Sequence, residues 1–300
     1  SSSTVFQLIL SLVAFGMMAN LMNIATNTQA CLVEKMYGRN IMSSFHGLWS
    51  LGGFSGGIIG AVFANTLLPI EAHFGTILAM SLVIIAVGFR FLVDDATAKA
   101  EEEDVPKFSF RTIDPILFLL GLMGFAGMFC EGTVYDWSGV YFSSVVKPDE
   151  AFIRAGYVAG MGAMTLGRFL ADGFVTKYGP ARVLKVCGGL IVGGLWLAAA
   201  LPYLIPATFG FLLVGFGISS SVPICYSIAG KLGTIKASIA ITIVSSISFF
   251  GFLVGPPVIG WLAEATGLRI AISIAACLGL MIAFVATKVS KRFSIDTDRA

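Results

Sequence analysis

The sequence predicts an all-α polytopic membrane protein, and three observations support that fold class. The 300 residues are 57% hydrophobic and only 12% charged, whereas soluble domains carry about 25% charged residues. The mean hydropathy is +0.90. Long runs without any charged residue, such as 1–33, 40–70 and 186–230, exceed the roughly 20 apolar residues that a helix needs to cross a bilayer.

Polar breaks between these runs predict nine membrane-spanning helices. Asp114 and Pro115 mark the start of the fourth helix, because aspartate caps helices and proline fits their first turn. The nine predicted spans are 4–31, 44–67, 73–93, 115–142, 152–174, 181–201, 206–230, 237–263 and 268–289. The break within 186–230 follows from the segment Leu201 to Pro206, which contains two prolines.

The order of these spans predicts two groups of helices. Residues 1–93 hold three helices, and residues 114–292 hold a six-helix bundle. A polar loop at 94–113, with the acidic run Glu101 to Asp104, is expected to join them as a solvated hinge. Residues 293–300 are expected to form a tail.

The positive charges predict the orientation in the membrane. If the first loop is cytoplasmic, sixteen of the 19 Lys and Arg residues lie on the cytoplasmic side, and only Lys147, Arg154 and Arg269 lie outside. Cytoplasmic loops are enriched in these residues. We therefore expect a cytoplasmic C-terminus and tail, an external first residue, and a bacterial-type cytoplasmic (inner) membrane.

No pattern in the sequence is typical of an enzyme or a metal site. The five cysteines lie singly within apolar runs, and no HExxH pattern or paired His/Cys spacing occurs. Neither an enzymatic activity nor a cofactor nor a metal is expected. No basic stripe with interleaved aromatic residues suggests nucleic acid.

Residues 167–184, GRFLADGFVTKYGPARVL, resemble the cytoplasmic loop signature of the major facilitator superfamily. The matching positions are Gly167, Asp172, Lys177, Gly179 and Arg182. The stretches HGLWSLGGFSGG and EGTVYDWSGVY are similar to the sugar-permease branch that includes fucose permease. This resemblance extends over the whole chain.

The resemblance implies a two-bundle architecture of twelve helices with both termini in the cytoplasm. The nine predicted spans would then be helices 4–12, with the first three missing. The signature residues, together with Arg168, would form a cytoplasmic latch that holds one conformation. The alternative for Asp172 and its neighbours is ordinary positive-inside charge and a turn at Tyr178 to Pro180.

The function that the resemblance implies is secondary active transport of a small polar solute, with a sugar as one candidate. The expected partners are this small-molecule substrate, protons and the lipid bilayer, and the protein is expected to be a monomer. Two alternatives stay open: an exporter of amphipathic compounds from the same superfamily, and a membrane receptor or scaffold that does not transport.

Polar residues in the first two spans suggest a lined cavity. Asn20, Asn23 and Asn27 fall within about 60° of one another on one helix face. His46 and Trp49 lie on one side of the second span. Such amides can bind a polar solute, or can join helices at about 0.6 kcal/mol per hydrogen bond. We interpret them, with Tyr135, as candidates for the substrate cavity.

Glu131 and Asp136 are the candidates for proton coupling. Glu131 follows Pro115 by sixteen residues, or about 24 Å of helix, and an ionised carboxylate at that depth is costly unless it has a partner or faces water. Asp136 lies about 7 Å further along, nearer the interface, and can simply meet water. A structural hydrogen bond is the alternative role for Glu131. The glycines around it predict a loosened, gate-like helix: Gly124, Gly127, Gly132 and Gly139.

Overall fold

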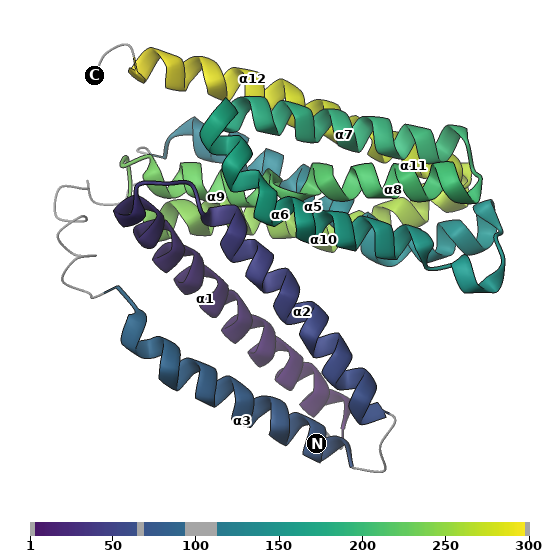
Figure 1. Ribbon diagram of the computed structural model, residues 1–300, viewed down its shortest axis with the longest axis horizontal. Coiled ribbons are helices and arrows are strands. Elements are labelled where there is room, and N and C mark those ends of the chain that lie inside the picture. The colour runs from purple at the N-terminus through teal and green to yellow at the C-terminus, as the bar shows by residue number, and fades with distance from the viewer. Residues whose placement is uncertain (1–3, 65–68, 94–112, 298–300) are drawn as a thin grey trace.

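The computed structural model describes residues 4–64, 69–93 and 113–297, and every regular element in these ranges is a helical one (Figure 1). The predicted fold class is confirmed, since each of the nine expected spans has a helical counterpart. The expected hinge with its acidic run lies outside the described residues apart from Ile113.

The first three helices, purple to blue in Figure 1, form the three-helix group: α1 Val5–Tyr37, α2 Met42–Ala64 and α3 Ile70–Gly88, the last followed by a 3-10 turn, η1 Phe89–Phe91. Thr4 caps α1 by accepting a hydrogen bond from the Gln7 amide at 3.2 Å. Gly38 ends α1 in the left-handed conformation, with φ 67°, which glycine adopts without strain. The helix thus continues six residues past its predicted end at residue 31, because the charge of Glu34 is satisfied within the protein.

The six-helix group fills the rest of the described chain. Its helices are α5 Pro115–Tyr141, α6 Ala155–Tyr178, α7 Pro180–Ala200, α8 Leu204–Ser219, α9 Ser221–Lys231, α10 Ala237–Thr266, α11 Leu268–Ala275 and α12 Cys277–Thr297. A π turn, η3 Phe142–Val146, and a 3-10 turn, η4 Glu150–Phe152, connect α5 to α6. The span predicted at 206–230 is divided at Ser220 into α8 and α9. Pro223 explains the break, because a proline ring clashes with the carbonyl four residues earlier.

α12 is helical to Thr297, so the expected tail at 293–300 is helical in its described part. Within the part of the chain that the structure describes, seven helical segments are long and apolar enough to cross a membrane. The two remaining expected spans, α2 and α6, have similar lengths of 23 and 24 residues.

Glycines bring the helices of the six-helix group close together. A Cβ atom at Gly251 would overlap the Phe125 carbonyl oxygen across the contact of α10 with α5. A Cβ atom at Gly124 would overlap the Ser248 side chain in the same contact. A Cβ atom at Gly127 would lie 2.9 Å from the Cβ atom of Ser221 in α9. Gly124 and Gly127 therefore serve as packing surfaces, whereas Gly139 has nothing within 4 Å of its missing Cβ. α5 is one continuous helix, and the gate-like role expected of its glycines stays a prediction.

The two groups meet at one end and diverge towards the other (Figure 1). We call their meeting point, where the turn between α1 and α2 lies against α6 and α9, the junction. Away from it, the N-terminal half of α1 and most of α3 are exposed.

Candidate functional site: a cavity between the two helix groups

A cavity of about 440 Å³ lies between the two groups next to the junction. Both groups contribute to it: α1, α2 and η1 from one, and α5, α6, α9 and α10 from the other. Its lining is mostly apolar, with a few polar side chains. The lining residues are Met22, Asn23, Thr26, Asn27, Gln29, Ala30, Val33, Phe45, His46, Trp49, Phe91, Leu92, Met128, Glu131, Tyr135, Arg168, Val222, Tyr226, Phe249 and Phe252.

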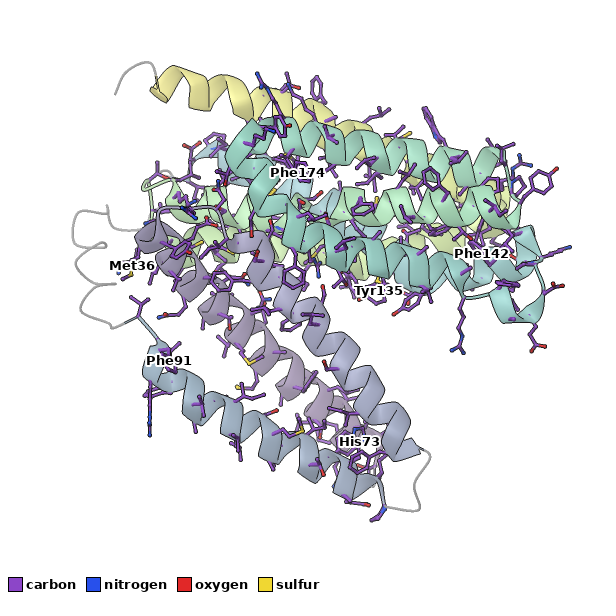
Figure 2. The ribbon with its side chains drawn as sticks, in the orientation of Figure 1. Met36, His73, Phe91, Tyr135, Phe142 and Phe174 are labelled. Carbon is purple, nitrogen blue, oxygen red and sulfur yellow. The ribbon has the colours of Figure 1, made fainter. Side chains whose placement is uncertain are left out.

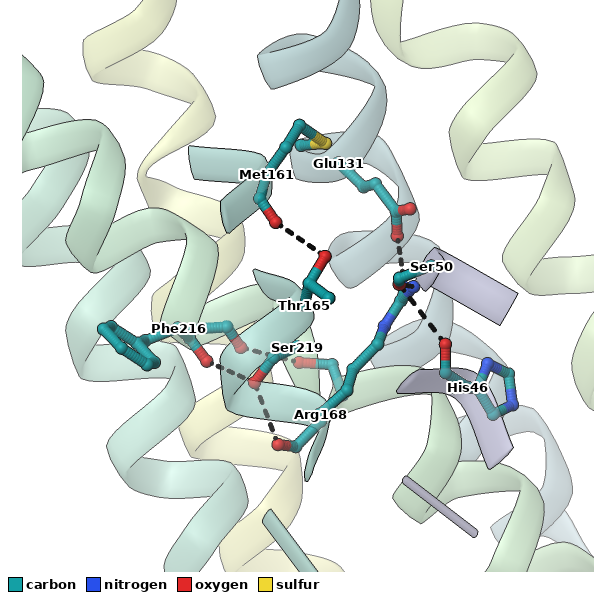
Figure 3. A network of polar contacts seen from close by, with 11 residues as sticks. His46, Ser50, Glu131, Met161, Thr165, Arg168, Phe216 and Ser219 are labelled. Atoms are coloured by element: carbon teal, nitrogen blue, oxygen red, sulfur yellow. Dashed lines mark hydrogen bonds and ion pairs between the residues drawn. The ribbon is translucent and has the colours of Figure 1, made fainter. Parts of the chain in front are cut away.

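An ion pair lies in this cavity. Arg168 Nη2 lies 3.5 Å from the Glu131 carboxylate, and both side chains are largely buried, 6% and 13% exposed. Arg168 Nη1 donates to Ser50 Oγ at 2.5 Å, and Ser50 Oγ donates to the His46 carbonyl oxygen at 3.3 Å. Figure 3 follows this chain of contacts. It connects α5, α6 and α2, and so crosses between the two helix groups.

Two nitrogen atoms of the cavity lining are buried and have no hydrogen-bond partner among the described residues: Arg168 Nε and His46 Nε2. Buried polar groups are nearly always paired, with protein or with water. The His46 ring packs edge-on against the Tyr226 ring, with centroids 5.8 Å apart. The unpaired nitrogens therefore provide hydrogen-bonding capacity for a molecule that enters the cavity.

Amides of α1 form one wall of the cavity. Asn27 Nδ2 donates to the Asn23 carbonyl oxygen at 2.9 Å and lies 3.3 Å from Asn23 Oδ1. Gln29 holds the end of the α3 region, since Val93 donates its amide to Gln29 Oε1 at 3.0 Å and accepts from Nε2 at 3.3 Å. Asn20, the third member of the predicted stripe, is exposed and does not line the cavity.

Aromatic side chains line the opposite wall. Tyr135 packs edge-on against Tyr157 and Phe252, with centroids 5.8 and 6.1 Å away. Figure 2 shows Tyr135 on the face of the six-helix group that is turned towards α2. Trp49 lines the cavity from α2 but is 65% exposed. Flat apolar faces beside polar groups are typical of small-molecule sites.

Asp136 is exposed and lies outside the cavity lining, unlike Glu131. The structure therefore separates the two carboxylates that the sequence paired as proton-coupling candidates. Their spacing of five residues explains this, because it rotates the second side chain by about 140° around the helix.

A second polar cluster lies at the junction and surrounds the start of α2. Glu34 accepts hydrogen bonds from the amides of Ile41 and Met42 at 2.8 and 2.7 Å. Asp172 of α6 accepts from the amides of Ser43 and Ser44 at 3.0 and 2.8 Å, and from Ser44 Oγ at 2.5 Å. We call this arrangement of two carboxylates on four amides the α2 cap. Negative charge is favourable at a helix N-terminus, where amides lack partners.

The α2 cap also extends to α9. Glu34 accepts a short hydrogen bond from Ser227 Oγ, and its Oε1 lies 2.5 Å from Lys231 Nζ. Glu34 is 1% exposed, so the ammonium group compensates a buried charge. The cap thereby ties α1 and α2 to both α6 and α9.

Of the expected latch residues, Asp172 is the one that caps the start of α2 at the junction. Arg168, four residues earlier and deeper, lies in the cavity instead, because one turn of helix displaces it by about 6 Å. Gly167 packs against Ser219 of α8. Gly179, with φ 81°, separates α6 from α7. The other two, Lys177 and Arg182, are exposed.

Sequence reasoning missed Glu34 and the cavity role of Arg168. Glu34 is the first charged residue after a run of 33 uncharged ones, which is a usable signal for a buried carboxylate at the end of a span. Arg168 was hidden within a cytoplasmic signature. In the described ranges, no group of three His, Cys, Asp or Glu side chains could hold a metal ion.

Comparison with known proteins adds the family context. The family model described as Major Facilitator Superfamily matches residues 1–235. An uncharacterized MFS-type transporter of Yersinia pestis is 32% identical over 286 residues, which cover 94% of this chain and 72% of that protein. An uncharacterized transporter of Sinorhizobium fredii is 33% identical over 286 residues, covering 94% and 74% of the two chains.

Two further similarities are more partial. Membrane protein MosC of Rhizobium meliloti is 30% identical over 281 residues, covering 91% of this chain and 66% of that protein. The crystal structure of the Escherichia coli fucose:proton symporter FucP superposes with a TM-score of 0.50 at 18% identity, covering 65% of this chain and 45% of that one. At this identity the likeness shows the fold alone.

Proposed function

We propose a function from one premise: the chain belongs to the major facilitator superfamily, and it is an integral membrane protein of the transporter type. Within that family, we infer that it is a secondary active transporter that moves a small polar solute, a sugar among the candidates, in exchange with or together with protons. The solved neighbour, a fucose:proton symporter, supports this direction.

The observation that carries the proposal is the Glu131–Arg168 pair inside the cavity between the two groups. A carboxylate at the interface of two moving bundles can exchange protons with whichever side is open. Its arginine partner responds to that protonation, because the attraction between the two depends on the carboxylate charge. The amides Asn23 and Asn27 and the aromatic wall provide contacts for a polar solute with apolar faces.

The α2 cap supports a conformational role for Asp172. It closes the junction in the conformation described, while the groups diverge elsewhere. We propose that the junction faces the cytoplasm of a bacterial-type inner membrane, in line with the distribution of Lys and Arg. On that orientation, the C-terminus is cytoplasmic and the cavity opens outwards.

Glu131→Gln tests the proposal. This change keeps the shape and the hydrogen bonding of the side chain but removes its titration. In proteoliposomes of the full-length protein, we expect it to abolish accumulation driven by a pH gradient, while exchange of unlabelled for labelled solute continues. Glu264→Gln is the matched control, because Glu264 is exposed on α10 and does not line the cavity.

Accumulation that persists in Glu131→Gln would exclude this residue as the coupling site. Loss of both accumulation and exchange, in protein with unchanged thermal stability, would make Glu131 a solute-binding group instead. Flux without any pH dependence in the parent protein would contradict proton coupling altogether.

The predominantly apolar lining favours one second candidate, export of amphipathic compounds. Phe45, Phe249, Phe252 and Met128 would suit such a solute better than a sugar. Substrates of this kind partition into lipid, so the discriminating measurement is efflux of a lipophilic dye from vesicles. Dye efflux that polar solutes do not inhibit would favour the exporter.

A further inference from the structure

We propose that the solute is a small organic monoanion, and that its carboxylate takes the place of Glu131 on the Arg168 guanidinium when Glu131 is protonated. This inference rests on the proposed function and specifies its substrate class. It is argued from the geometry of the guanidinium, from the charges of the cavity and from the groups around Glu131.

The guanidinium of Arg168 presents one under-used edge. Nε and Nη2 form the parallel pair of donors that matches the two oxygens of a carboxylate. Nη1 is engaged by Ser50 at 2.5 Å, whereas Nη2 meets Glu131 only at 3.5 Å and Nε has no partner among the described residues. Glu131 thus balances the charge of Arg168 but does not satisfy the donor pair Nε and Nη2.

The charges of the cavity lining indicate that the solute is negatively charged. Among the described residues that line the cavity, only Glu131 and Arg168 carry a formal charge, since a neutral His46 adds none. The empty cavity is therefore neutral when the pair is ionised. A proton on Glu131 leaves one uncompensated positive charge in a mostly apolar space, which is costly. A bound monoanion restores neutrality, whereas a neutral sugar does not.

The loaded and empty states then have the same net charge. One proton binds the Glu131 carboxylate, one solute carboxylate pairs with Arg168, and both leave on the other side. The transported unit of one proton and one monoanion is electroneutral. We expect uptake to respond to a pH gradient and not to the membrane potential.

The titratable groups around Glu131 come from several helices. Arg168 and Tyr157 come from α6, Tyr135 from α5 itself, His46 from α2 and Tyr226 from α9. The helices α10, α11 and α12 also pack against α5, but those of their titratable residues whose side chains the structure describes do not line the cavity: Glu264, Arg269, Cys277 and Lys288. Among these described residues, Arg168 is therefore the cation whose ion pair is lost when Glu131 is protonated.

The remaining lining fits a small hydroxylated acid. His46 Nε2 is available for a hydroxyl group, and Asn23 and Asn27 line the facing wall. The cavity, about 440 Å³, lies at the small end of the range of ligand sites. A sugar acid combines a carboxylate for Arg168 with hydroxyls for these groups.

Binding by purified full-length protein tests the inference. The probes are monocarboxylates of two to six carbons, from acetate to gluconate, each with its neutral partner, from ethanol to glucose. We measure affinity by calorimetry at several pH values, and proton uptake in weakly buffered solution. Acids should bind and their neutral partners should not, with about one proton taken up per acid, and affinity should weaken by up to about tenfold per pH unit as pH rises.

Three variants of the ion pair and two control variants separate the roles. Arg168→Gln should weaken acid binding about 100-fold, from the loss of a charge-assisted fork, and Arg168→Lys should weaken it less. Glu131→Gln should bind acids at least as tightly as the parent, without proton uptake or pH dependence. Arg154→Gln and Glu264→Gln are the charge-matched controls, since both residues are exposed, and should behave like the parent.

Three results would overturn the inference: neutral partners that bind as well as the acids, acid binding that survives Arg168→Gln unchanged, or no binding of any acid at millimolar concentrations. The first of these, combined with pH-driven uptake that Glu131→Gln abolishes, would leave the proposed proton-coupled function standing. By contrast, uptake driven by a pH gradient that persists in Glu131→Gln would contradict the proposed function.

Discussion

At the residue scale, the site depends on which way a side chain points and not only on its depth in the membrane. Glu131 and Asp136 lie one and a half turns apart on the same helix, yet one lines the cavity and the other is exposed. Arg168 and Asp172 are a single turn apart, and one reaches the cavity while the other caps α2. Small differences in position thus assign different environments to similar residues.

Asp136→Asn should leave transport nearly unchanged. Water can replace a lost interaction at an exposed side chain, and exposed substitutions usually shift stability by less than about 0.5 kcal/mol. We expect uptake within about twofold of the parent with the same pH dependence. Uptake assays run beside Glu131→Gln provide the comparison, and a loss of pH dependence in Asp136→Asn would reverse the two assignments.

The sequence predicted several of the cavity residues, because polar groups within apolar helices are costly and so indicate a function. Asn23, Asn27, His46, Trp49, Glu131 and Tyr135 were predicted and do line the cavity. Their partners could not be predicted, since Arg168 comes from another helix and its contact with Glu131 depends on how the helices pack. Their roles in transport stay predictions.

At the element scale, α2 has no side-chain cap of its own, and two other helices provide it. Glu34 and Asp172 accept hydrogen bonds from four consecutive amides, Ile41 to Ser44. Contacts of this kind depend on the relative position of three helices. The hydrogen bonds at the start of α2 therefore form only when the junction is closed.

Asp172→Asn should favour the conformation in which the junction is open. The amide side chain keeps an acceptor but loses the charge, which is worth up to about 2 kcal/mol at a partly buried helix N-terminus and hence a factor of about 5–30 in the equilibrium. Labelling of a cysteine placed at Asn40, which lies beside Asp172, should become faster. Glu150→Gln, an exposed charge removed elsewhere, is the control, and equal labelling rates would reduce Asp172 to a turn residue.

Neighbouring glycines of α7 provide a second prediction at this scale. A Cβ atom at Gly194 would overlap the Gly210 carbonyl oxygen of α8, whereas one at Gly193 would meet nothing within 4 Å. Gly194→Ala should lower the melting temperature, because α7 and α8 must separate. Gly193→Ala should raise or keep it, since alanine is favoured over glycine in helices by about 1 kcal/mol. Equal melting temperatures would contradict the close contact of these helices.

At the scale of the whole molecule, the spans followed from hydropathy, but their arrangement did not. Nine helical spans could be predicted because an apolar run in a membrane has few alternatives to a helix. The divergence of the two groups (Figure 1) depends on contacts between residues distant in sequence, such as Cys31 with Gly230. The resemblance predicted two bundles, and the conformation came from the structure.

Gly230→Val should force the junction apart. Gly230 of α9 packs directly against the Cys31 side chain of α1, and an added Cβ would overlap its sulfur atom. We expect faster labelling of a cysteine at Asn40, in a protein in which the exposed Cys277 has been replaced by serine. Gly173→Val is the control, because Gly173 has nothing within 4 Å of its missing Cβ. Labelling that does not change in Gly230→Val would show that this contact does not hold the junction closed.

The α2 cap has a consequence for how turnover can be observed. While the junction is closed, the four amide protons of Ile41 to Ser44 are held by carboxylates. Each opening of the junction exposes these amide groups to solvent, where deuterium can replace their protons. Hydrogen–deuterium exchange at these four positions therefore records how often the protein opens, in unlabelled protein and without knowledge of its cargo. Solutes that drive the cycle would be recognised because they accelerate that exchange.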